Sequence, residues 1–338
     1  MGKILNLLGK FLAVILSIPF IPLATASIIL LSLSLVLFTP ATYKFVLAKQ
    51  KIYEKLPAIV ADQFETQRNY TPKDVSEETE SGAPPFLKNI DQAGWELILT
   101  DLLPANILKS QVEEALNQFL GAINFGNPNV KISLSKLKEH ILNGGGTRAY
   151  LDLVRSQPPC TQSQLAQWGE NLTELPTCSP PEEILVQFTP KIQEELTKVL
   201  ANLGNEVDLS QSMGENLAIA TKVRWGTTAA PIVPVLILSL ITLLGARTNR
   251  GRMVWAGILL IISGLIGIGL AVSATPAFDW AWATYGASNV PAYYSPTLVD
   301  AGIALAKTLT ITAAAATGVV FGLTILLGGF LIAKAVRR

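Results

Sequence analysis

The sequence has few charged residues, and they are unevenly distributed. Only 15% of its 338 residues are Asp, Glu, Lys or Arg, and half are hydrophobic. An ordinary soluble domain has about 25% charged residues. This composition excludes a soluble globular domain, a disordered chain and a collagen-like chain. The formal net charge of +1 provides no overall attraction to nucleic acid, so no nucleic-acid partner is expected.

Histidine and cysteine are also scarce. His140 is the only histidine, and Cys160 and Cys178 are the only cysteines. A structural zinc site needs about four such ligands. The two cysteines also lack the Cys-x-x-Cys spacing of a redox pair. We therefore expect no metal site, no cofactor and no redox centre.

Patterns typical of catalytic sites are incomplete. The glycines of 144–146 are not followed by the lysine of a phosphate-binding loop. Ser133 and Lys136 have the Ser-x-x-Lys spacing of serine acyl-enzymes, but the companion motifs of that class are absent. His140 falls in a lysine-rich helix, where a surface position is expected. We predict a non-enzymatic protein and assign no catalytic residue.

Four long windows contain no charged residue at all: 11–43, 225–246, 253–278 and 308–333. Each exceeds the roughly 20 residues that a helix needs to cross a bilayer. Since the backbone must satisfy its own hydrogen bonds in lipid, each window should be helical. We predict transmembrane helices at 13–38, 230–246, 253–274 and 309–333. The first is expected to remain as an anchor kinked at Pro19 and Pro22, because its apolar run is too long for a signal peptide.

The basic residues near these windows predict an orientation. Lys3, Lys10, the three arginines of 247–252 and the three basic residues of 334–338 form one all-basic group, whereas segment 44–224 has a net charge of −6. Basic flanks favour the cytoplasm. We therefore expect segments 1–12, 247–252 and 334–338 inside the cell. The large segment 39–229 and the loop 275–308 are expected outside, in a multi-pass protein of the cell membrane.

The predicted fold is an integral membrane α-helical protein. It has four transmembrane helices and a large, mainly α-helical extracytoplasmic domain between the first two. Apolar spacing predicts helices at 105–123, 136–142, 147–156, 161–169 and 182–203. Further helices are expected at 43–67, interrupted near Pro57, and at 86–103. The polar stretch 69–85 is expected to be a loop.

A weak internal repeat suggests a short two-stranded pairing. The alternating segment 130–134, followed by Ser135 as a helix cap, compares with 207–209 followed by Ser210. A helix containing Glu-Glu precedes each segment. If the repeat is real, the two strands pair and bury Leu134 and Leu209; a chance similarity is the alternative.

The two cysteines lie in proline-rich sequence within the predicted outer domain. Disulfides persist in such oxidising compartments. Cys160 and Cys178 flank one short predicted helix, and a bridge between them would close a short loop. We predict a structural disulfide.

Small residues recur at four-residue spacing in the last two predicted spans. They are Ser263, Gly267 and Ala271 in the third span, and Ala314, Gly318 and Gly322 in the fourth. Such ridges allow two helices to approach closely. Packing within one chain is the favoured interpretation, and a homo-oligomer is the alternative.

The second outer loop is rich in aromatic residues. Tryptophan and tyrosine favour the membrane interface. We expect these residues to act as interfacial anchors or to pack beneath the outer domain, and a partner-binding patch is the alternative. The residues are Phe278, Trp280, Trp282, Tyr285, Tyr293 and Tyr294.

Four spans with two unequal outer loops form a layout that is similar to those of tetraspanins and claudins in topology alone. The larger loop comes first here, unlike in tetraspanins, and its cysteines lack the tryptophan-rich setting of the claudin loop. The sequence favours a non-enzymatic binding, assembly or sensing protein. Its partners would be the lipid bilayer and a protein or envelope component that contacts residues 44–224. The alternative is a transporter or an accessory subunit of a transport complex.

Overall fold

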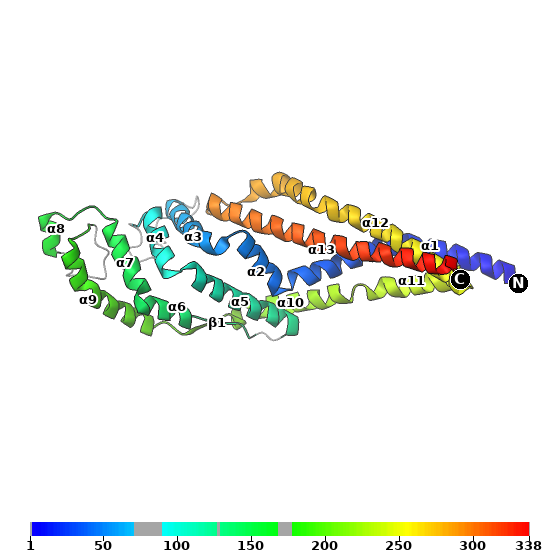
Figure 1. Cartoon of the computed structure of the whole chain (residues 1–338), viewed down its shortest axis with the longest axis horizontal. Helices are drawn as coiled ribbons and strands as arrows, with labels where there is room; N and C mark the ends of the chain where they lie inside the picture. The colour runs from blue at the N-terminus through cyan, green and yellow to red at the C-terminus, as the bar shows by residue number, and fades with distance from the viewer. Residues whose placement is uncertain (1, 71–89, 127–128, 168–177, 338) are drawn as a thin grey trace, which may run out of the picture.

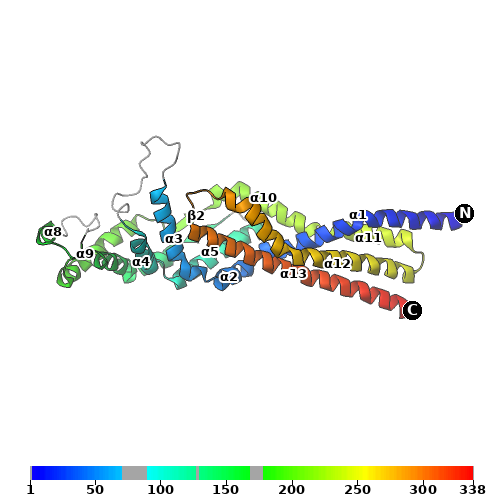
Figure 2. The same cartoon turned by 90° about the horizontal axis from the view of Figure 1, so that it is seen from above.

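The computed structural model describes residues 2–70, 90–126, 129–167 and 178–337 as an elongated and almost entirely helical molecule. Both chain ends lie at one end of the long axis, and α8 (Gln162–Gln167) and α9 (Glu182–Ala201) lie at the other (Figures 1 and 2). The predicted polar loop 69–85 falls almost wholly outside the described residues.

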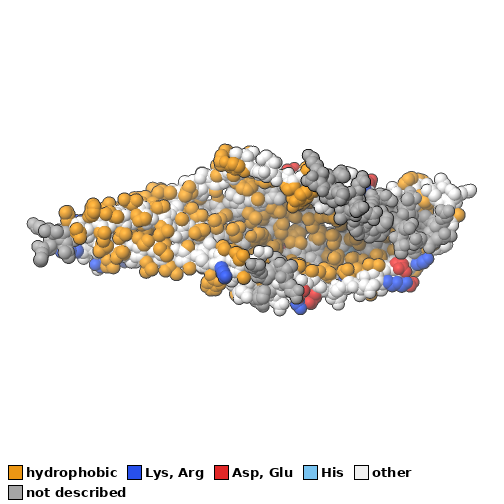
Figure 3. Space-filling view, turned by 180° about the vertical axis from the view of Figure 1, so that it is seen from behind, with side chains coloured by type: hydrophobic (Ala, Val, Ile, Leu, Met, Phe, Trp, Pro, Cys, Tyr) orange, Lys and Arg blue, Asp and Glu red, His pale blue; other side chains and the backbone are white. Residues whose placement is uncertain are grey.

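Four helices form the half of the molecule that contains both termini, here called the bundle. In the described residues they are α1 (Gly2–Leu37), α11 (Ile232–Gly245), α12 (Asn249–Ala281) and α13 (Pro296–Arg337). Helix α1 contacts the other three helices, and the most extensive contact is between α12 and α13. Hydrophobic side chains cover the outside of the bundle (Figure 3). An apolar exterior of this extent fits a membrane protein.

Four segments are long and apolar enough to cross a membrane: Leu7–Leu37, Asn216–Gly245, Asn249–Asn289 and Pro296–Arg337. They contain the four charge-free windows of the sequence almost completely. Helix α1 is continuous through Pro19 and Pro22. The second segment combines the end of α10 (Ser210–Ala229) with α11, and a short turn at 230–231 separates the two helices.

The other half of the molecule, here called the arm, is a chain of shorter helices. They are α2 (Pro40–Lys49), α3 (Ile52–Asn69), α4 (Gln92–Leu102), α5 (Ala105–Phe125), α6 (Ser135–His140), η2 (Ile141–Gly145) and α7 (Gly146–Arg155), followed by α8 and α9. Helix α7 packs against α4 and α9. Its buried face carries Leu153 and Val154, which are 3% and 0% exposed.

Helix boundaries correct two expectations. The chain between 43 and 67 breaks at Gln50 and Lys51 rather than at Pro57, which lies inside α3. Ser135 does not cap α6, because the cap position falls on Leu134 and the Ser133 hydroxyl accepts the Ser135 N–H. The chain turns at Gly144, whose φ of +101° suits glycine, and continues directly into α7.

The two strands of the described chain pair as the repeat predicted. β1 (Lys131–Ser133) and β2 (Glu206–Asp208) are antiparallel, with Ile132 opposite Val207. The flanking contacts are symmetric: Leu134 N–H donates to Asn205 O at 2.7 Å, and Leu209 N–H donates to Val130 O at 2.9 Å. Leu134 and Leu209 are half-buried. The pairing joins the end of α5 to the start of α10 and thereby closes the arm.

Candidate functional site

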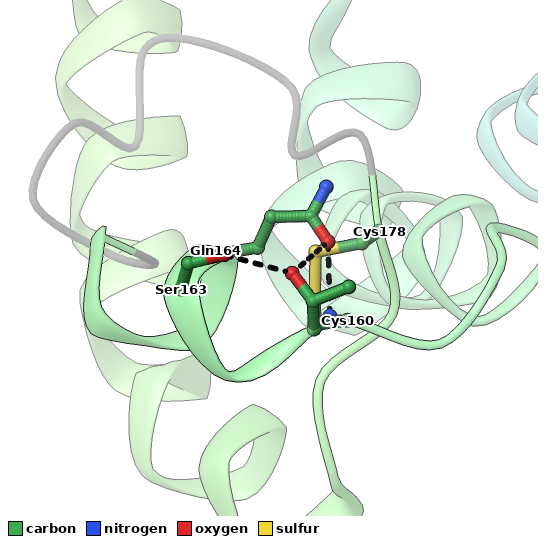
Figure 4. Close-up of a disulfide and its surroundings, with 5 residues drawn as sticks. Cys160, Ser163, Gln164 and Cys178 are labelled. Carbon is green, nitrogen blue, oxygen red and sulfur yellow. Dashed lines mark hydrogen bonds between the residues drawn. A yellow bond between two sulfur atoms is a disulfide. The ribbon is translucent and has the colours of Figure 1, made fainter.

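The predicted disulfide is confirmed and lies at the distal end of the arm. Cys160 and Cys178 are bonded, with their Cα atoms 4.8 Å apart (Figure 4). The backbone adds a short parallel bridge beside it, in which Cys160 N–H donates to Ser179 O at 3.0 Å and Ser179 N–H donates to Pro158 O at 2.7 Å. These bonds hold the end of α7 next to the start of α9.

The short helix α8 is fixed to the same corner. Thr161 N–H and the Thr161 hydroxyl both donate to the Gln164 side-chain oxygen, at 2.9 and 2.8 Å (Figure 4). Such a turn satisfies N–H groups that the start of a helix leaves unpaired. The distal corner is therefore ordered by covalent and hydrogen-bonding constraints together.

A guanidinium bridges α7 and α9 close to the disulfide. Arg155 donates to Glu182 at 2.5 Å and to Asp152 at 2.9 Å. The hydrogen bond from Arg155 lowers the pKa of the exposed Glu182 carboxyl. The same two acceptors raise the pKa of Arg155. No local sequence pattern predicts the contact of Arg155 with Glu182, because the two residues are far apart in the chain.

Helices α4, α6 and α7 bring a second polar cluster together. Burial raises the pKa of the Asp101 carboxyl, and the neighbouring Asp152 raises it further by its charge and its hydrogen bond, against the opposing effects of Arg148 and His140. His140 Nε2 lies 2.8 Å from Asp101 O. His140 is half-buried, which corrects its expected surface position.

Tyr150 lies on α7 in this part of the arm. Burial raises the pKa of its phenol to about 12. Its hydroxyl finds no hydrogen-bond partner among the described residues. The phenol is therefore neutral at physiological pH and serves the packing of the arm rather than acid–base chemistry.

The aromatic loop after α12 divides into two groups. Tyr293 and Tyr294 stack with ring centroids 4.5 Å apart, and Tyr293 also lies 5.9 Å from Tyr70 at the end of α3. Gln63 of α3 donates to Tyr293 O at 2.7 Å and accepts from Ser295 N–H at 2.8 Å. This group connects the bundle to the arm.

The other group lies where α12 passes into η3 (Trp282–Gly286) and η4 (Ala287–Asn289). Trp280 and Tyr285 meet edge to face at 5.6 Å and are each more than half exposed. Trp282 covers Gly286, and Phe278 is half-buried. The six predicted aromatic residues thus do not form one surface: some pack on α3 and others face outward.

The small residues of the bundle differ in what they contact. Ser263 is fully buried, and the Thr25 hydroxyl of α1 reaches its carbonyl at 3.4 Å. A Cβ at Gly267 would clash with the Phe321 ring. Ala271 and Ala314 are half-buried. A Cβ at Gly318 or Gly322 would meet no atom of the described chain within 4 Å.

The sequence analysis does not predict a close backbone-to-backbone approach of α12 and α13 at Gly257 and Gly328. A Cβ at Gly257 would lie 2.6 Å from Gly328 O, and one at Gly328 would lie 2.7 Å from Gly257 O. A Cβ at Gly264 would likewise lie too close to the side chain of Ile325 in α13. A seven-residue spacing links Gly257 to Gly264, and this was the available signal. The four-residue pattern of small residues does not include Gly257 or Gly264.

The described residues contain no group of three or more His, Cys, Asp or Glu side chains that could hold a metal ion. The polar clusters of the arm tie helices together, and α9 exposes the apolar side chains of Val186 and Val199. Comparison with family models, with curated proteins and with solved structures finds no match for this chain.

Proposed function

We propose that this is a membrane-anchored binding protein whose arm contacts a protein or envelope partner outside the cell. The observation that carries the proposal is an exposed apolar strip on the braced arm. Val199, Leu203 and Val207 are 63%, 48% and 40% exposed along the segment from α9 to β2. Apolar patches exposed to water on a soluble surface commonly mark contact sites.

The orientation is part of the proposal. The basic residues of 247–252 and 334–337 lie at the same end of the bundle as the termini, opposite the arm (Figure 1). By the positive-inside rule this end faces the cytoplasm. The disulfide in the arm supports the same assignment, because such bonds persist in oxidising compartments.

Cysteine labelling of intact cells tests this orientation. An impermeant maleimide should modify Val199→Cys in the arm and leave Arg250→Cys unmodified until the membrane is opened. The disulfide uses the two native cysteines, so neither competes for reagent. Labelling at position 250 in sealed cells would show that the protein has the opposite orientation.

Photo-crosslinking in native membranes tests the partner. A photoreactive residue at Val199 should give a protein adduct of one discrete mass. Val186 is the matched control, because it has 62% exposure on α9 but lies about 140° away from Val199 around the helix, at 3.6 residues per turn. Leu326, 70% exposed on α13, should give lipid adducts only. Equal adducts at 186 and 199, or none at 199, would contradict a specific contact surface.

Ion transport is the alternative that the bundle disfavours. The four charge-free windows place no ionisable side chain inside the spans, and ion paths usually require one. Several hydroxyls inside the bundle bond to their own helices, as Ser32 does to Ile28 O and Ser263 to Leu260 O, and the Thr25 hydroxyl donates across to Ser263 O. The protein reconstituted alone in liposomes should carry no ionic current. A current that disappears when Pro19 and Pro22 become alanine would favour a transporter instead.

A further inference from the structure

The end of α5 exposes a large aromatic side chain far in sequence from any span. Phe125 is the last residue of α5 and is 87% exposed. The helix stops there because Gly126 adopts a φ of +70°, and its N–H donates to Ala122 O at 2.8 Å. Helix α5 runs from the arm back toward the bundle (Figure 1).

Hydrogen bonds fix this end of α5 to the outer end of the bundle. Asn124 donates to Phe38 O, just after α1, at 3.0 Å. Arg224 of α10 donates to Asn124 O at 2.6 Å. Buried Leu120, Ile123 and Leu217 pack together beside these bonds. The exposed Phe125 is therefore held in place where the arm joins the bundle.

This position matches the edge of a bilayer. Arg224 and Ala246 are about 33 Å apart along α10 and α11 at 1.5 Å per residue, close to the roughly 30 Å hydrocarbon core. Arg252 and Asp279 span about 40 Å on α12 by the same rise, and Asp279 pairs with Lys307 of α13 at 2.8 Å. Both helices thus place Arg224 and the Asp279 pair near the headgroups farther from the termini.

A second exposed aromatic lies beside Arg224. Trp225 is 63% exposed, and the Arg224 guanidinium lies 6.0 Å from the centroid of its ring. Lys222 is also exposed on α10. An aromatic ring combined with a cation suits the interface, where the ring meets acyl chains and the cation meets phosphate.

We propose that Phe125, Arg224 and Trp225 form an interfacial foot that inserts into the leaflet farther from the termini. The occupant of this surface is phospholipid. The surface is continuous with the apolar exterior of the bundle through α10, and its basic residues complement lipid phosphate. The foot braces the arm against the membrane, so the arm does not pivot freely on α2 and α10.

Spin-label accessibility in the full-length protein tests the foot. The native cysteines form the disulfide, so Phe125→Cys gives a single labelling site. The protein is reconstituted at low density in phosphatidylcholine and phosphatidylglycerol liposomes. We expect the label at 125 to be relaxed more by oxygen than by a water-soluble nickel complex. A label at Val199→Cys on the arm should show the reverse.

Two controls separate the foot from the membrane assignment and from local damage. Leu265→Cys, a site 59% exposed on α12, must prefer oxygen if the bundle spans the bilayer. Nickel preference at 265 would reject the membrane placement, whereas nickel preference at 125 alone would reject the foot. Trp225→Cys repeats the measurement from α10 in case a label at 125 disturbs α5. Protection of 125 from both reagents that increases with protein density would assign the surface to a second copy and also overturn the proposal.

Discussion

The bundle and the arm distribute their residues in opposite ways. In the bundle, the buried positions of α12 and α13 include Gly257, Ser263, Gly267 and Gly328, whereas leucines such as Leu265 and Leu323 are about 60% exposed. In the arm, Leu153, Val154 and Leu185 are nearly fully buried, and charged residues lie outside. One chain thus contains two kinds of helix packing.

The proposed placement of the bundle in lipid and of the arm in water accounts for the difference. In water, burying leucine and valine drives helices together, at roughly 25 cal/mol per Å² of apolar surface. In lipid, an exposed leucine loses nothing, so helices associate through close packing of small residues. The arm needs constraints against unfolding in water and has a disulfide and the Arg155 bridges. The bundle needs only accurate helix contact.

Removing the disulfide should have the largest effect and should be confined to the arm. We expect Cys160→Ser to destabilise the arm by about 2–4 kcal/mol, as is typical for native disulfides. Hydrogen exchange of the detergent-solubilised protein should accelerate in α7 and α9 while α12 and α13 stay protected. Acceleration throughout both halves would show that they unfold as one unit.

Filling the backbone-to-backbone contact between Gly257 and Gly328 should have the next largest effect. A side chain at Gly257 must displace the Gly328 carbonyl, which would lie 2.6 Å from its Cβ. Overpacking of this kind costs about 1–3 kcal/mol, so Gly257→Val should lower the thermal stability of the bundle. Gly318→Val is the matched control, because its Cβ meets no described atom within 4 Å. Equal loss in both variants would contradict the specific α12–α13 contact.

The long apolar windows made the spans predictable, since the absence of charge over more than 20 residues is a strong local signal. The disulfide followed from there being only two cysteines in one segment. The strand pairing followed from similar sequence around Leu134 and Leu209. Each of these signals can be read within a short stretch of chain or from a single pair of residues.

The missed features depend on how helices face one another. Gly257 and Gly318 are both small, yet only Gly257 faces a partner helix, and the rotation of α12 against α13 decides this. The lysines near His140 predict a surface position, but His140 ends α6 and its Nε2 lies against Asp101 O. The break at Lys51 carries no glycine or proline, so the sequence around it resembles a continuous helix.

Lys51 offers a smaller test at the joint between the two halves. It ends the α2–α3 corner with a φ of +53°, a left-handed conformation that is unfavourable for residues other than glycine. Lys51→Gly should stabilise the protein by roughly 0.5–1 kcal/mol, since relief of backbone strain exceeds the added entropy of the unfolded chain. Thermal unfolding in detergent measures the change, with the exposed Lys55→Gly inside α3 as a control that should destabilise. Lower stability of Lys51→Gly would show that the lysine side chain contributes more than its backbone strain costs.

The smallest expected effect is a pH dependence of stability that is confined to the arm. Burial, and then Asp152, raise the pKa of Asp101, so the folded arm binds this proton more tightly than the unfolded chain. Stability should therefore fall as pH rises from the ordinary Asp value through the raised one. Asp101→Asn should abolish that fall and leave the arm more stable at neutral pH.

Glu182→Gln should instead lower the stability of the arm at neutral pH. The hydrogen bond from Arg155 lowers the pKa of Glu182, so the stabilisation that Glu182 provides is present above the ordinary Glu value. Hydrogen exchange in α7, followed from acidic to neutral pH, measures both variants. The bundle contains no such group in its spans, so α12 and α13 should show no change in either variant; matched changes in both halves would mean that the arm and bundle are coupled.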